Sequence, residues 1–143
     1  MLRAPTLKSV MTPFPSSIDA EAPVREAIEF MREAGFRHLP VTVDGTVQGV
    51  VSDRDIQLIL GPDFAYPRED EVRVKDAITG GPHVVDINTR LDSALHYIVE
   101  HHIDSVAVTK HGKLVGIFTA TDACRAFAEH LGAFFNAPGD DAA

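Results

Sequence analysis

Two short stretches of this chain carry a hydroxyl and a carboxylate at the same spacing. In residues 49–55 Ser52 is followed three positions later by Asp55, and in residues 116–122 Thr119 is followed by Asp122. A glycine and two apolar residues, β-branched or aromatic, precede each hydroxyl, which is typical of the end of a buried strand. We therefore predict a strand-to-helix corner at each stretch. Its free N–H groups, hydroxyl and carboxylate would suit a phosphorylated, hydroxylated ligand.

A purely structural interpretation of these corners stays open. The Ser/Thr-x-x-Asp pattern is close to the capping box, which satisfies the first N–H groups of a helix and needs no ligand. Helix capping explains either copy on its own. The occurrence of the same corner twice in one chain favours a shared functional role.

Length and composition limit the class of protein. With 143 residues, the chain is long enough for one compact domain or two very small units that share a core. No apolar run is long enough to cross a bilayer, and the first residues lack the apolar region of a secretion signal. The single cysteine, Cys124, fits a reducing compartment, so we expect a cytoplasmic protein with Cys124 buried in its last helix.

The charge balance bears on partners. Thirteen basic and 21 acidic residues give a formal net charge of −8, which argues against nucleic acid or an anionic membrane as partner. The acidic runs at residues 69–71 and 140–141 lie outside the periodic segments, and we interpret them as solvated charge.

The chain is an internal repeat. Without a gap, Gly49 matches Gly116 and Asp55 matches Asp122, and the same offset aligns the preceding residues back to Thr12 and Thr79. We predict one unit over residues 8–61, a connector over 62–72, a second unit over 73–131 and a flexible tail over 132–143. Each unit reads as an extended piece, a helix, two strands and a second helix.

In the first unit, the prolines of residues 10–18 predict extended backbone. A helix should begin near Pro23 and end at Gly35, strands should cover residues 38–43 and 47–51 around an Asp44-Gly45 turn, and a helix should run from Ser52 to Leu60.

In the second unit, we predict a helix over residues 91–99, strands over 105–109 and 113–118, and a last helix from about Thr121 to Leu131. Beyond Leu131 the chain should fray, or Phe134 and Phe135 should dock against the body. One unit is too small to cover both faces of its sheet. The two sheets should therefore face each other, with the helices outside.

Several motifs together resemble the tandem CBS-domain family, also called the Bateman module. They are Val-Met-Thr-Pro at residues 10–13, Arg-His-Leu-Pro-Val at 37–41, the Asp44-Gly45 turn and the two corners. The resemblance covers nearly the whole chain. It implies an α/β (α+β) fold in which two β-α-β-β-α units pack as a pseudo-twofold pair. It also implies two clefts that bind adenosine nucleotides or S-adenosylmethionine, and a regulatory role without catalysis.

The resemblance also implies roles for single residues. Asp55 and Asp122 would accept hydrogen bonds from ribose, and Ser52 and Thr119 would donate to phosphate or ribose oxygens. Arg37 and His38 would meet phosphate, while the extended pieces near Ile18 and Val85 would line the adenine slot. The full set of predicted ligand-binding residues is Ile18, Arg37, His38, Ser52, Arg54, Asp55, Val85, Thr119, Thr121 and Asp122.

The two halves differ at a position that matters. Asp104 and Ser105 stand in the second unit where Arg37 and His38 stand in the first. A carboxylate beside a polyphosphate is repulsive unless a cation such as Mg²⁺ intervenes, so the cleft with Arg37 should suit phosphate better. Arg54 has two open interpretations, a surface ion pair with its neighbouring aspartates and a contact with a phosphate tail.

Seven histidines raise the question of a metal site. His96 and His101 are five positions apart, a poor spacing for one helix face, and no second cysteine supports a zinc motif, so we expect no metal. No nucleophile and no acid–base pair stand out as catalytic machinery.

Assembly and output complete the expectations. We expect a homodimer, because family members pair through outer helices and because the apolar stripes of residues 24–31 and 91–99 need cover. No cofactor is obligatory, an adenosyl compound is the regulatory ligand, and a protein not identified by the sequence would be regulated. The alternative is a ligand-independent scaffold for dimerisation or docking, in which both corners are only helix caps.

Overall fold

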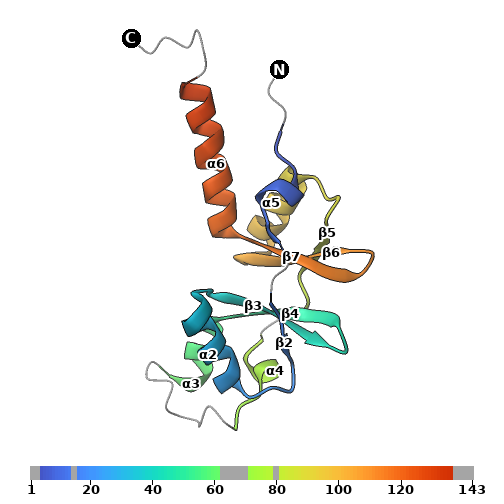
Figure 1. The fold of residues 1–143 in the computed structure, drawn as a ribbon, viewed down its shortest axis with the longest axis vertical. Helices are drawn as coiled ribbons and strands as arrows, with labels where there is room; N and C mark the ends of the chain where they lie inside the picture. Colours follow the sequence, from blue (N-terminus) through green and yellow to red (C-terminus); the bar gives the residue numbers. More distant parts are fainter. Residues whose placement is uncertain (1–3, 14–15, 62–70, 79–80, 137–143) are drawn as a thin grey trace.

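Two small sheets, each covered by helices, form the body of the molecule (Figure 1). The computed structural model describes residues 4–13, 16–61, 71–78 and 81–136. The first sheet has the order β2-β3-β4, with β2 (Ile18–Asp19) parallel to β3 (His38–Val43) and β3 antiparallel to β4 (Thr46–Ser52). The second has the order β1-β7-β6-β5, with β1 (Thr12–Pro13), β5 (Val84–Asp86), β6 (Ser105–Lys110) and β7 (Lys113–Thr119).

Six helices complete the described part of the chain. They are α1 (Leu7–Val10), α2 (Val24–Ala34), α3 (Asp53–Leu60), α4 (Val74–Ala77), α5 (Leu91–His101) and α6 (Ala120–Phe135). The sheets meet through β4, β6 and β7, and the helices lie outside them (Figure 1). The predicted architecture of facing sheets and outer helices is therefore confirmed. The first unit carries α2 and α3, and the second carries α5 and α6.

The repeat extends to backbone detail. Both hairpins turn through two left-handed residues, Asp44 and Gly45 in the first unit and His111 and Gly112 in the second. Positive φ at both turn positions matches the right-handed twist of the flanking strands. The β3–β4 register shifts after Val41, and the β6–β7 register shifts at the equivalent Val108. The two units thus share turns and bulges as well as an element order.

The segments that lead into each unit pack against the other unit. The β1 strand pairs with β7, and Leu7 of α1 lies in the core of the second unit. In the same way Val74 and Ala77 of α4 lie in the core of the first. The prediction of extended backbone at residues 10–13 is correct for β1 but wrong at Val10, which ends a short helix begun by a Thr6 capping box. The exchange ties the two units together.

The repeated glycine of each corner makes room for the exchanged segment. A Cβ on Gly116 would lie 2.6 Å from Met11 Sδ and 3.0 Å from the Thr12 carbonyl oxygen. A Cβ on Gly49 would lie 3.2 Å from Ile78 Cγ2. Met11 and Ile78 are equivalent in the repeat, so both glycines serve the same crossing.

The last helix departs from the prediction at two points. It continues to Phe135 rather than ending near Leu131, because its backbone ladder runs on until the Asn136 amide side chain caps the Gly132 carbonyl. Cys124 is exposed rather than buried, because Asp122 is the residue of α6 that turns into the body. Residues 137–143, most of the predicted flexible tail, lie outside the described residues, as does most of the predicted connector.

The apolar stripe of α2 needs no partner. Val24, Ala27, Ile28 and Met31 are buried within the single chain. This corrects part of the reason for expecting a dimer, since α4 and the sheet of the first unit already cover that stripe. Among the described residues, eight large apolar side chains are exposed, and four of them lie on α6. No helix in the described ranges is long and apolar enough to cross a bilayer.

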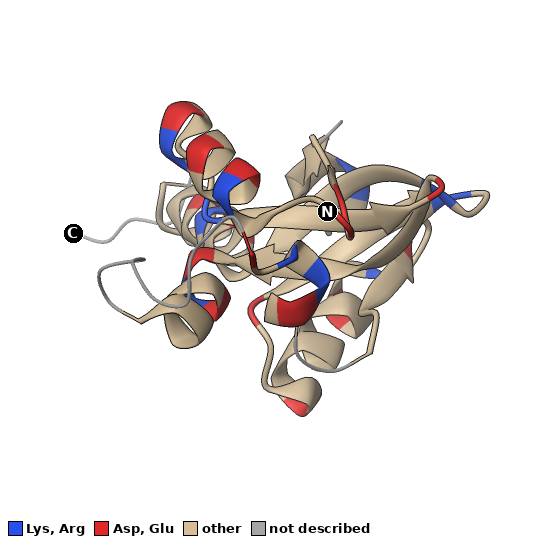
Figure 2. Cartoon of the chain, turned by 90° about the horizontal axis from the view of Figure 1, so that it is seen from below, with Lys and Arg blue, Asp and Glu red and all other residues tan. Residues whose placement is uncertain are grey.

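Charged residues are interspersed over the helices. Figure 2 shows acidic and basic segments side by side on the helical surface rather than gathered into one face of a single sign. One exposed pair joins the exchanged α4 to the first unit, with Lys75 Nζ 2.7 Å from Glu21 Oε1. The hydrogen bond that Lys75 donates to this carboxylate raises the pKa of Lys75.

Candidate ligand-binding clefts

Two clefts lie between the units, and each joins the corner of one unit to the start of the first long strand of the other. The first cleft has a volume of about 640 Å³ and places Thr119, Thr121 and Asp122 opposite Arg37 and His38. The second has a volume of about 330 Å³; its walls include Ser52, Arg54 and Asp55 from the first unit and Asp104 and Ser105 from the second. Eight of the ten predicted residues therefore line a cleft.

Both corners are fully formed capping boxes. The Asp55 N–H donates to Ser52 Oγ over 3.1 Å, and the Ser52 N–H donates to Asp55 Oδ2 over 2.9 Å. Thr119 and Asp122 form the same pair of bonds, each 3.1 Å long. Helix capping therefore accounts for the repeated hydroxyl and carboxylate, and any evidence for a ligand must come from the rest of each cleft.

Asp122 is the most deeply placed of the acids in the two clefts, with 5% of its side chain exposed. Its Oδ1 accepts a hydrogen bond from Arg125 over 3.0 Å, and the Thr12 hydroxyl lies 3.3 Å from Oδ1 and 3.4 Å from Oδ2. Sequence reasoning missed Arg125 and Thr12 as cleft residues. The spacing of Asp122 and Arg125 on one helix face was the available signal for the arginine.

Arg37 brings a further positive charge to the first cleft. Its carbonyl accepts a hydrogen bond from the Asp53 N–H, which fixes the backbone beside α3. Within the described residues its guanidinium has no ion-pair partner, so the charge is available to the cleft. Phe36 lies next to it, 46% exposed and stacked on Phe30, and forms an apolar part of the wall.

A contact between His38 and Asp104 connects the two clefts. His38 lines the first cleft, and its buried Nε2 lies 3.1 Å from Oδ2 of Asp104, which lines the second. The distance is that of an ion pair, but the geometry does not make a hydrogen bond. An anionic group that enters the first cleft would therefore compete with the Asp104 carboxylate for contact with His38.

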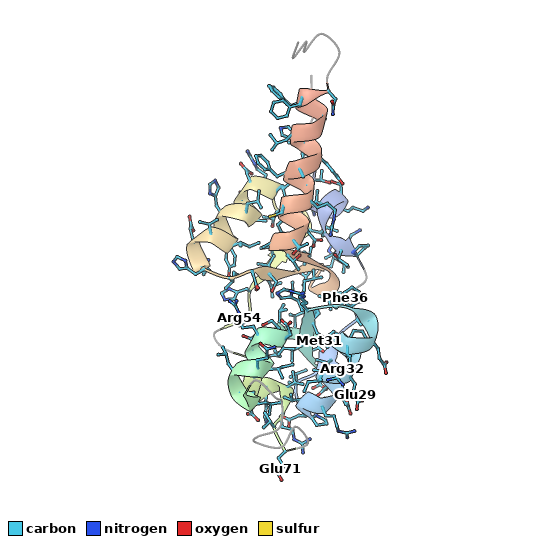
Figure 3. All side chains as sticks on the ribbon, turned by 90° about the vertical axis from the view of Figure 1, so that its left-hand side faces the viewer. Glu29, Met31, Arg32, Phe36, Arg54 and Glu71 are labelled. Carbon is cyan, nitrogen blue, oxygen red and sulfur yellow. The ribbon has the colours of Figure 1, made fainter. Side chains whose placement is uncertain are left out.

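The second cleft has a smaller volume than the first and is lined by two carboxylates in place of one. Asp55 and Asp104 line it together with Arg54, His83 and His102. Figure 3 shows Arg54 at the level where the two units meet. The Arg54 side chain makes no ion pair with a described residue, so the structure does not contain the surface ion pair proposed as one of its two interpretations.

Ile18 and Val85 lie in the cores rather than on the cleft walls. Ile18 packs against the core of the first unit and Val85 is buried in that of the second. The extended pieces that contain them do reach the clefts, through Ser16 in the first and His83 in the second. Contact between these two side chains and adenine stays a prediction.

Three aromatic side chains form a cluster at the edge of the second cleft. His83 Nδ1 lies 2.8 Å from the Tyr97 hydroxyl, and the rings of Tyr97 and His101 stack at 3.9 Å. These contacts give the histidines packing and hydrogen-bonding roles. In the ranges that the structure describes, no three His, Cys, Asp or Glu side chains are arranged to hold a metal ion.

Comparison with known proteins identifies the family. The CBS domain profile matches residues 7–61 and 74–129, so the chain belongs to the CBS-domain family and contains two such domains. This confirms the resemblance drawn from the motifs.

Individual relatives agree with that assignment. The Bacillus subtilis protein YlbB is 35% identical over 101 residues, which are 69% of this chain and 66% of that protein. Hypoxic response protein 1 of Mycobacterium tuberculosis is 28% identical over 131 residues, 87% of each chain. The solved structure of CBSX2 in complex with AMP matches with a TM-score of 0.73 and 29% identity, over 90% of this chain and 99% of that one.

Proposed function

We propose that this protein is a non-catalytic sensor in which the first cleft binds a phosphorylated adenosyl ligand, with AMP as the leading candidate. The observation that carries the proposal is that Arg37, which has no ion-pair partner among the described residues, faces the buried carboxylate of Asp122 across one cleft of about 640 Å³. A guanidinium suits phosphate and a carboxylate suits ribose hydroxyls. The CBSX2 structure, which holds AMP, supports the choice of ligand.

Each end of such a ligand has a counterpart in the cleft. Arg37 and the Thr119 hydroxyl would meet the phosphate, beside the N-terminus of α6. Asp122 already accepts hydrogen bonds from Arg125 and from the capping N–H, and a carboxylate can accept more than these. A ribose hydroxyl would therefore donate to Asp122 in place of the long contact from Thr12. Phe36 offers an apolar surface to the base.

The second cleft would take a less charged adenosyl ligand such as S-adenosylmethionine, or none. Asp55 and Asp104 oppose a polyphosphate there unless Mg²⁺ accompanies it. Binding in either cleft could change the equilibrium between two angular arrangements of the units. The change in free energy could be no larger than the difference between the ligand's binding free energies for the two arrangements. The regulated protein and a cytoplasmic location stay predictions from the sequence.

A thermal-shift panel tests the function. Wild type and the variants Asp55→Ala and Asp122→Ala would be melted with AMP, ADP, ATP, NADH and S-adenosylmethionine, after removal of bound ligand. A rise of several degrees with an adenosyl compound, lost in Asp122→Ala and kept in Asp55→Ala, supports the sensor. No shift with any compound contradicts it and favours the scaffold.

The exposed stripe on α6 favours a second role, dimerisation or docking. Phe127, Leu131, Phe134 and Phe135 follow one another at helical spacing, and Phe127 is 62% exposed. We propose that two copies pair through this stripe. Light scattering coupled to size exclusion would give the dimer mass for wild type and the monomer mass for Phe127→Glu; a monomer in both cases contradicts the pairing.

A further inference from the structure

A third cavity lies away from both clefts, on the outer side of the second unit. Its volume is about 750 Å³, and it separates the leading segment, residues 4–8, from the chain that enters α5, residues 87–92. Leu95 and Lys110 complete its walls. We call this cavity the open seam. In the first unit the two equivalent edges are joined, so the two units can be compared at this position.

In the first unit, the equivalent edges are zipped together. Three backbone hydrogen bonds connect them, from the Val24 N–H to Val72, from the Val74 N–H to Ala22 and from the Lys75 N–H to Ala20, with lengths of 2.8, 2.9 and 3.0 Å. Pro23 and Arg73 form an antiparallel bridge between the edges. The 2.7 Å ion pair of Lys75 with Glu21 closes the outer side.

In the second unit these connections are missing. The repeat places Pro5, Leu7 and Lys8 opposite Leu91, Thr89 and Ile87, yet no hydrogen bond joins residues 4–8 to residues 87–91 in the described part of the chain. Asn88 stands where the first unit has Glu21, so Lys8 lacks the carboxylate that Lys75 has. Both edges therefore keep free backbone donors and acceptors that face a cavity.

The charge of the open seam is positive. Lys8 and Lys110 have no ion pair with any described residue. Arg90 is matched by Asp92, with contacts of 3.0 and 2.9 Å, and the pair adds no net charge. Leu91 and Leu95 supply apolar surface between these charges. An occupant would thus meet two free backbone edges, an apolar floor and two lysines.

We propose that the open seam binds an extended acidic segment of a partner protein, which enters between residues 4–8 and residues 87–91. Backbone hydrogen bonds to free donors and acceptors give such segments their affinity, and side-chain contacts give specificity. In the first unit the two edges supply each other with these backbone partners, and the carboxylate of Glu21 meets the lysine equivalent to Lys8. An acidic segment would supply the second unit with the backbone partners and the carboxylate that its own edges do not provide.

Fluorescence anisotropy with two synthetic probes tests the proposal on the full chain. One probe alternates glutamate and valine over five residues, and the other alternates lysine and valine. The acidic probe should bind and the basic one should not. Lys8→Glu should weaken the acidic probe by about tenfold or more. Arg32→Glu, the same reversal of charge on α2 of the first unit and outside the seam, should leave its affinity nearly unchanged at physiological salt.

Asn88→Glu makes the seam like that of the first unit and should abolish binding while AMP still raises the melting temperature. Equal binding of the two probes, no binding of the acidic probe, or equal effects of Lys8→Glu and Arg32→Glu overturns the proposal. Hydrogen exchange supplies a separate check. Protected Leu7 and Leu91 amides without a probe would show that the leading segment itself closes the seam, which also overturns the proposal. The anisotropy and hydrogen-exchange readouts require no ligand in the clefts.

Discussion

The two clefts are built alike and charged differently. Each combines a capped corner of one unit with the opening residues of a long strand of the other, and each borders the crossing of an exchanged segment. The first cleft has Arg37 and Arg125 around Asp122, whereas the second has Asp55 and Asp104 with Arg54. Caps and crossings fix the frame of the repeat in both units alike. If the clefts bind ligands as proposed, the few residues that face each cleft would set its preference.

Arg37, whose guanidinium pairs with no described acidic residue, should give the greatest loss of AMP affinity when it is removed. Arg37→Ala should weaken AMP binding by about tenfold to hundredfold, because one charge-assisted hydrogen bond is worth about 1.5–3 kcal/mol. Isothermal titration calorimetry measures the change. Arg54→Ala removes an arginine from the second cleft and serves as the matched control. Its AMP affinity should be unchanged. Equal losses in the two variants would erase the distinction between the clefts.

The costs of filling the two crossings should have different causes. Gly116→Ala forces a Cβ against the Thr12 carbonyl oxygen and Met11, so it should destabilise the fold by about 1–3 kcal/mol. Gly49→Ala meets only the Ile78 side chain at 3.2 Å or more, but Gly49 has a φ of 157°, so its cost should come mainly from backbone strain. Urea denaturation gives both values. If Gly116→Ala left the stability unchanged, the close approach of residues 11 and 12 would not constrain this position.

The two caps should contribute equally to stability and unequally to binding. Ser52→Ala and Thr119→Ala each remove one capping bond, at a cost of about 1 kcal/mol. Only Thr119→Ala should also weaken AMP binding, because its hydroxyl lines the first cleft. Chemical denaturation and calorimetry on the same two proteins separate these effects. If the AMP affinity of Thr119→Ala equals that of wild type, the Thr119 hydroxyl caps the helix and does not contact the ligand.

The smallest effect concerns pH and an exposed ion pair of the second unit. The hydrogen bond from Arg90 lowers the pKa of Asp92. A carboxyl with a lowered pKa contributes stability above its unfolded pKa and loses it as the pH falls through its folded pKa. The small stability difference between wild type and Arg90→Gln should therefore be present at neutral pH and shrink below about pH 4. A difference that grows on acidification has the wrong sign for this pair.

Much of the fold could be predicted because the repeat gives each element twice. Strand and helix periodicity, the hairpin turns and the Gly35 stop are local signals, and all are found in the structure. The exchange of α1 and α4 between units could not be read in this way. It depends on contacts between segments far apart in the sequence, for which Gly49 and Gly116 were the only trace.

The candidate site shows the same limit. The corners were visible because caps follow short-range rules, but which strand faces which corner is a matter of tertiary packing. Arg125 therefore escaped notice, and Ile18 and Val85 were expected at the clefts although the cores hold them. Cys124 was expected to be buried because of its apolar neighbours, yet it is exposed, since Asp122 is the residue of α6 that turns into the body.

Calorimetric titration of the ligand-free wild-type protein with AMP reports how many sites bind and how tightly. We expect one tight site per chain, in the cleft of Arg37 and Asp122, with any second site much weaker. Two sites of equal affinity, or no binding at all, would contradict the claim that the charges of the two clefts set their preference for ligand.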